Sequence, residues 1–232
     1  MEQLQNYGDA RQTAGCVHCG GIPDTRDHVP SKIFLDEPYP ENLPVVGACQ
    51  ICNQRLSLDE EYLACLIECA RVGDAMPSAV EREKVRRILM KKPALTSKLA
   101  QARVVGAEGN ISFNAEIERA GKVLLKLARG HALFELNEPH LAEPERFGVI
   151  PLHCLSDNDL RVFEEPPGSP ISIWPEVGSR AMQRMLIADD DVFNGWIVVQ
   201  PGRYRYLAYV DSAVTVRMVL SEYLACEVVW EE

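Results

Sequence analysis

The chain of 232 residues lacks the features of a membrane or secreted protein. It has no run of about 18 apolar residues, the length that a membrane-spanning helix needs. Its first fifteen residues lack the basic start and the apolar stretch of a secretion signal. It also has no internal repeat and no low-complexity segment. We therefore expect a globular protein of the cytoplasm that does not contact a membrane.

Basic residues are scarce: 24 Lys and Arg stand against 34 Asp and Glu, a net charge of −10. Phosphate binding draws on Lys and Arg, so the whole surface is not expected to bind nucleic acid. The basic residues are concentrated, because residues 71–130 hold 13 basic and 6 acidic side chains (+7) and residues 131–232 hold 7 and 17 (−10). We expect DNA contacts from the middle of the chain, and a protein partner or a second copy of the chain at the acidic C-terminal region.

The hydrophobic pattern predicts an α+β fold with three regions. Residues 16–53 are rich in Cys, Pro and Gly, which is typical of a small module held by a metal. Residues from about 195 onward alternate β-branched and aromatic side chains, which predicts a meander of three or four antiparallel strands. Between them, helical spacing predicts helices over 58–73, 78–92, 94–103 and 114–136, and a short helix over 179–188. We expect two domains, residues 1–75 and 76–232.

Four of the eight cysteines form two C-x2-C pairs, Cys16 with Cys19 and Cys49 with Cys52. Without a secretion signal, cysteine spacing is interpreted as metal ligation before disulfides. Two such pairs can offer four thiolates to one tetrahedral Zn²⁺, which stabilises the fold and performs no chemistry. His18 lies inside the first pair and could replace a thiolate, but a loop or surface role is favoured.

The other four cysteines are Cys65, Cys69, Cys154 and Cys226. A thiol without a metal packs as a small hydrophobic group, so we predict that all four are core residues. A redox role for the C-x2-C pairs is disfavoured, because no βαβ pattern surrounds either pair.

Three polar positions fall between or directly after the cysteine pairs: the dipeptide Asp27-His28, Asn42, and Asn53 behind the last cysteine. With the two pairs, this order resembles the HNH endonucleases, the ββα-metal nucleases. Their motif is an Asp-His pair that ends a strand, an Asn in a following strand or loop, and an Asn or His at the start of a helix. The resemblance covers about 50 residues, from Gly15 to about Asp59. It implies a zinc-stapled ββα module.

The resemblance also implies a role for each position. His28 would be the general base that takes a proton from water, Asp27 and Asn53 would hold a catalytic Mg²⁺ or Mn²⁺, and Asn42 would orient the loop and the imidazole. One carboxylate and one amide oxygen leave such an ion open positions for phosphate and water. The implied activity is metal-dependent hydrolysis of phosphodiester bonds in DNA, and the family's settings include restriction and phage defence.

Each position alone also has a structural interpretation. An Asp-His pair is often a surface turn, an Asn behind a cysteine pair is often a helix cap, and Asn42 could start a strand. The alternative function is a non-catalytic zinc module that binds nucleic acid or a protein partner. We favour the enzyme, because His28 and Asn53 are both present.

Basic side chains near these positions are candidate phosphate contacts. Lys32 and Arg55 flank the motif and could hold phosphates, but an ordinary solvated position is equally favoured for each. Four more cations recur at i, i+3, i+7 and i+10 on the predicted helix 114–136, namely Arg119, Lys122, Lys126 and Arg129. That spacing places them on one side of a helix, where they could follow a phosphate backbone. An ordinary solvated helix face is the equally favoured alternative.

Overall fold

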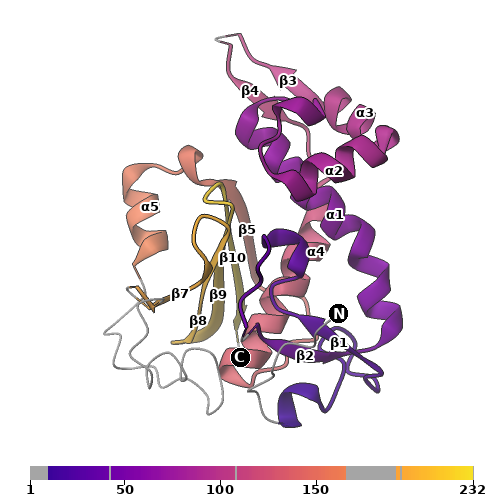
Figure 1. Cartoon of the computed structure of the whole chain (residues 1–232). Helices are drawn as coiled ribbons and strands as arrows, with labels where there is room; N and C mark the ends of the chain where they lie inside the picture. The colour runs from indigo at the N-terminus through magenta and orange to yellow at the C-terminus, as the bar shows by residue number, and fades with distance from the viewer. Residues whose placement is uncertain (1–9, 42, 108, 166–191, 194, 232) are drawn as a thin grey trace. The chain divides into compact units, whose positions relative to one another are not determined.

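The computed structural model describes residues 10–41, 43–107, 109–165, 192–193 and 195–231. It shows a mixed α+β protein of helices and antiparallel sheets, as the sequence predicts (Figure 1). The chain divides into two compact units: unit 1 comprises residues 1–55 and 124–232, and unit 2 comprises residues 56–123. The expected boundary at residue 75 falls inside unit 2.

The N-terminal part of unit 1 has the order strand, strand, helix. Strand β1 (Thr25–His28) pairs with β2 (Val45–Ala48) in antiparallel register, with Thr25 opposite Ala48 and His28 opposite Val45. Helix α1 (Gln50–Val72) begins directly after β2. Short 3-10 turns lie before and between the strands, η1 (Ala10–Thr13) and η2 (Lys32–Phe34). The Asp-His pair therefore ends a strand, as the resemblance implied.

A close backbone approach determines one residue of this hairpin. A Cβ atom on Gly47 of β2 would lie 2.6 Å from the carbonyl oxygen of Gly15, just before the first cysteine pair. The Val17 amide donates to the Gly47 carbonyl at 2.9 Å. Any larger residue at position 47 would push β2 away from the first pair.

The C-terminal part of unit 1 is a six-stranded antiparallel sheet in the order β5-β10-β9-β8-β7-β6. The predicted meander is confirmed by four of these strands, β7 (Trp196–Gln200), β8 (Tyr204–Val210), β9 (Ala213–Leu220) and β10 (Leu224–Glu231). Strand β6 (Val192–Phe193) pairs with β7. Strand β5 (Arg146–Pro151) pairs with β10, and the 3-10 turn η5 (Leu152–Cys154) and helix α5 (Asp157–Glu164) follow it.

Helix α4 (Ile117–His131) continues into a π-type turn, η4 (Ala132–Leu136). The turn ends at Asn137, whose φ of 58° is left-handed. Within unit 1, η4 contacts β2 of the N-terminal hairpin and also β8 and β9 of the large sheet. The N-terminal hairpin and the large sheet therefore both pack against η4.

A second link joins the large sheet to the loop after η2. The Gln200 side chain accepts from the Asp36 amide at 2.8 Å and donates to the Asp36 carbonyl at 3.0 Å. Arg203 donates to the Asp36 carboxylate at 2.6 Å. The C-terminal sheet thus holds a loop that lies between the two cysteine pairs in the sequence.

Unit 2 contains most of α1, the 3-10 turn η3 (Pro77–Ala79), α2 (Glu83–Lys91), α3 (Pro93–Ala102), and the hairpin of β3 (Arg103–Val105) and β4 (Ile111–Phe113). Its core includes Tyr62, Leu89 and Leu99. Gly73 follows α1, as predicted. The three-residue strands of the hairpin carry too short a pattern to be predicted.

Three of the four core predictions for cysteine are confirmed, because Cys65, Cys69 and Cys226 are buried. The prediction for Cys154 is wrong. This residue ends η5, beyond the last paired residue of β5, and its side chain is exposed. The helix expected over 179–188 lies outside the described residues. None of the described helices is long and apolar enough to cross a membrane.

Candidate functional site

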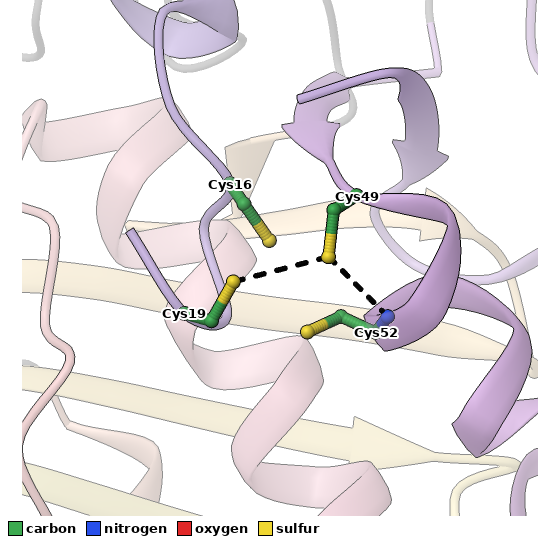
Figure 2. Close-up of side chains that lie close together, drawn as sticks. All are labelled: Cys16, Cys19, Cys49 and Cys52. Carbon is green, nitrogen blue, oxygen red and sulfur yellow. Dashed lines mark hydrogen bonds between the residues drawn. The ribbon is translucent and has the colours of Figure 1, made fainter. Parts of the chain in front are cut away.

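The four cysteines of the C-x2-C pairs converge at one place (Figure 2). Their sulfur atoms all lie within 4.8 Å of one another, and the Cys19 and Cys49 sulfurs are 3.8 Å apart. A tetrahedral Zn²⁺ with Zn–S bonds of about 2.3 Å requires sulfurs about 3.8 Å apart. The four cysteines could therefore hold a zinc ion.

Backbone hydrogen bonds favour the thiolate form at one of the four cysteines, Cys16, whereas burial and the neighbouring thiols raise the pKa of Cys52. The Gly20 amide donates to the Cys16 carbonyl at 2.7 Å, and Gly20 has a φ of 72° that suits a residue without a Cβ. The Cys52 amide donates to the Cys49 sulfur at 3.4 Å. Burial alone would raise the pKa of Cys16, but hydrogen bonds from nearby backbone amides outweigh it and lower the pKa to about 7. A thiolate is the form that a metal needs.

Asp27 forms a buried polar group with His18, which lies between Cys16 and Cys19 in the sequence, and with Lys126; we name this group the Asp27 cluster. The Asp27 Oδ2 atom lies 3.1 Å from His18 Nε2 and 3.0 Å from Lys126 Nζ. The side chains of Asp27 and His18 are each 7% exposed, and that of Lys126 is 3% exposed. Lys126 also donates to the Ser31 hydroxyl at 3.4 Å. His18 therefore contacts a carboxylate and stands outside the set of four sulfurs.

The electrostatics of the Asp27 cluster keep the carboxylate ionised. Burial alone would raise the pKa of Asp27, but the hydrogen bond from His18 and the charge and hydrogen bond of Lys126 lower it below its usual value. An ionised carboxylate only accepts hydrogen bonds, so His18 Nε2 is the donor. Removing one partner of a buried ion pair typically costs about 3–5 kcal/mol.

His28 is the last residue of β1 and is half-buried. Burial is the main cause that lowers its pKa, and the positive charges of Lys32 and Lys126 add to this effect. The neighbouring Asp27 acts in the opposite direction and does not cancel it. The imidazole is therefore neutral at physiological pH, the form that can accept a proton.

Asn53 lies in the first turn of α1 and connects that helix to β1. Its Nδ2 donates to the Arg26 carbonyl at 3.2 Å and lies 3.4 Å from the Thr25 hydroxyl. Asn53 does not cap α1: the Asp24 carboxylate accepts from the Gln50 amide at 2.6 Å and takes that role.

Asp27 and Asn53 each offer one side-chain oxygen of the kind that a hard divalent cation binds. Asp27 offers a carboxylate whose Oδ2 is already bonded, and Asn53 offers an amide whose Nδ2 is already bonded, so each has its Oδ1 as the remaining oxygen. Oxygen atoms of this kind are the ligands that Mg²⁺ and Mn²⁺ prefer. Asn42, the other motif position, lies outside the described residues.

The predicted basic face on α4 differs from the structure. Arg119 donates to Asp59 at 2.5 Å and lies over the Tyr62 ring. Arg129 donates to two backbone carbonyls, and Lys126 belongs to the Asp27 cluster. These three cations are held by the protein itself, because this side of the helix packs against other elements. Lys122 is exposed.

Of the two basic residues that flank the motif, Arg55 is exposed and Lys32 is half-buried with its ammonium 5.3 Å from the centre of the Tyr39 ring.

No protein-family model, curated protein or solved structure matches the chain. The resemblance to HNH endonucleases therefore rests on the motif residues of the sequence alone.

Sequence reasoning missed the contacts of Asp24 and Lys126. Lys126 contacts Asp27 across about 100 residues of chain, and no local pattern predicts such a pair. One signal was present: this lysine interrupts the apolar run Val123-Leu124-Leu125-Lys126-Leu127-Ala128, where a charged residue is buried only if it has a partner.

Proposed function

We propose that the chain is an HNH-type endonuclease that hydrolyses phosphodiester bonds in DNA, in the cytoplasm, with restriction or phage defence as its setting. One observation carries the proposal. His28 ends β1 of an antiparallel hairpin, the next helix bears Asn53 bonded to that same strand, and the cysteine cluster joins hairpin and helix. This is the strand-strand-helix order of the ββα-metal nucleases.

In the proposed reaction His28 accepts a proton from water. The pKa of His28 is lowered, so its imidazole is neutral at physiological pH and can accept this proton. The partial exposure of the side chain allows water to reach it. The water oxygen then bonds to phosphorus while one P–O ester bond breaks. The leaving oxygen takes up a proton from solvent, and the protonated His28 returns its proton to solvent. The products are one phosphate monoester end and one hydroxyl end.

A divalent ion, when bound, would supply positive charge to the phosphate and to the leaving oxygen. Asp27 and Asn53 are the residues that would hold it, each through its Oδ1 atom. Zn²⁺ on the four cysteines would be structural, since four thiolates leave no open position for substrate.

The net charge of −10 indicates a small DNA footprint. Exposed Arg55 and Lys122 are the proposed phosphate contacts, and Lys32 can add to them. Each lost phosphate contact lowers the slope of log affinity against log salt by about 0.9 on duplex DNA. Lys122→Ala should lower this salt slope by about 0.9. Arg119→Met should leave the slope unchanged, because Arg119 is bonded to Asp59.

The test is conversion of supercoiled plasmid by zinc-loaded protein with Mg²⁺ or Mn²⁺. Wild type should nick or linearise the plasmid. Asn53→Ala should cut slowly and recover in part at higher metal concentration, because extra metal compensates for a weakened site. Absence of cleavage of any nucleic acid by wild type with every divalent ion would overturn the proposal.

One observation favours the alternative, a non-catalytic zinc module that binds nucleic acid or a protein partner. Lys126 already balances the charge of Asp27. A module that had lost catalysis would bind DNA with unchanged affinity when divalent ions are removed, and would not cut it.

A further inference from the structure

We propose that Lys126 and His18 are positioning residues, which hold the Asp27 carboxylate by one oxygen so that the other oxygen faces the divalent ion. This inference deepens the proposed function and depends on it. It assigns a role in the nuclease site to α4, which lies far outside the motif in the sequence.

The geometry of the Asp27 cluster supports this role. His18 and Lys126 both bond to Oδ2, at 3.1 Å and 3.0 Å. Within the part of the chain that the structure describes, no hydrogen bond or ion pair engages Oδ1. Two donors on one oxygen prevent the carboxylate from rotating, so Oδ1 keeps one direction.

Helix α4 contacts the segment around Asp27 at two levels. Lys126 reaches both Asp27 and the Ser31 hydroxyl. One turn further along, Gly130 packs so closely on Val29 that a Cβ atom at position 130 would lie 2.6 Å from a Val29 methyl group. The helix therefore fixes the chain on both sides of His28.

A purely structural role would not require these groups. Apolar residues of similar volume often replace a buried ion pair at no loss of stability. An ammonium beside a metal ligand also repels the metal, which weakens binding unless orientation outweighs repulsion. Outer partners of metal ligands typically contribute 10–100-fold to metal affinity or activity through orientation. We expect orientation to dominate here, because both donors bind the same carboxylate oxygen of Asp27, a residue that is 6% exposed.

The experiment measures Mn²⁺ affinity of the zinc-loaded full chain by electron paramagnetic resonance titration, without DNA. Lys126→Met removes the ammonium and keeps the length of the side chain. It should weaken Mn²⁺ binding by about 10–100-fold. Lys126→Arg keeps a charged donor and should restore much of the affinity. Lys91→Met, the same change at an exposed lysine, should leave the affinity within twofold.

A second variant covers the case in which Lys126→Met fails to fold. His18→Phe keeps an aromatic ring and removes the Nε2 donor, so Mn²⁺ affinity should fall in the same direction. Zinc content and circular dichroism report whether each variant is folded.

The outcomes separate this inference from the proposed function. Suppose that wild type binds one Mn²⁺ and that the Asp27→Asn substitution abolishes this binding. The inference is then overturned if folded Lys126→Met and folded His18→Phe both bind Mn²⁺ with an affinity within twofold of wild type. If wild type neither binds Mn²⁺ nor cuts DNA, the proposed function itself fails and the inference fails with it.

Discussion

Replacing Cys49 by Ser should unfold the N-terminal hairpin of unit 1. The Cys49 sulfur lies 3.8 Å from that of Cys19 and accepts the Cys52 amide, and it stands between β2 and α1. Structural zinc contributes on the order of 10–16 kcal/mol of apparent binding free energy, whereas a whole domain is stable by only about 5–15 kcal/mol. Losing even part of the zinc energy therefore exceeds what the hairpin can tolerate.

The loss should spread beyond the hairpin, because η4 packs on β2 as well as on β8 and β9. Hydrogen exchange measured by mass spectrometry should show faster exchange in β1 and β2, with a smaller increase in η4. Elemental analysis should find one zinc per chain in wild type and less in Cys49→Ser. Cys154→Ser is the matched control, because this exposed cysteine is not a ligand. Freshly purified wild type without zinc, or unchanged exchange in Cys49→Ser, would show that the four cysteines do not hold a structural zinc ion.

Three further results are expected. Asp24→Ala removes the cap on the Gln50 amide and should lower stability by about 0.5–2 kcal/mol in denaturant unfolding, and an unchanged midpoint would contradict the capping role. Gly130→Ala places a methyl group against Val29 and should cost about 1–3 kcal/mol, unless α4 can shift away. His28 has a lowered pKa, so cleavage that depends on its neutral form should persist below pH 6.5 and decline only as the pH falls through that lower pKa; a rate that already declines above pH 7 would argue against this base.

The parts of the fold that depend on local pattern could be predicted from the sequence. Helical spacing indicated α1 and α4, and alternation indicated β7–β10. The two C-x2-C pairs indicated the cysteine cluster, since two pairs of this spacing can offer four thiolates to one tetrahedral ion. Strand β5 was missed because most of it is exposed, so its residues lack the alternation that indicates a half-buried strand.

The contacts between distant residues could not be predicted. The four cations of α4 share a helical spacing, yet only the folded chain shows that Arg119 meets Asp59 and that Lys126 meets Asp27. The spacing of residues predicts which side chains share one face of a helix. It does not predict which other parts of the chain pack against that face. Similarly, the Asp36 link to Gln200 and Arg203 depends on the packing of the large sheet, which no motif encodes.

The most direct test of the central claim is the cleavage rate of His28→Ala beside wild type, on the same plasmid and at the same Mg²⁺ concentration. The substitution leaves the four thiolates, Asp27 and Asn53 in place, so zinc content, folding and DNA affinity should be unchanged. General-base catalysis contributes about 10²–10⁴-fold, so we expect a loss of at least about 100-fold in rate that added metal does not restore. Cleavage by His28→Ala at the wild-type rate would show that His28 is not the general base.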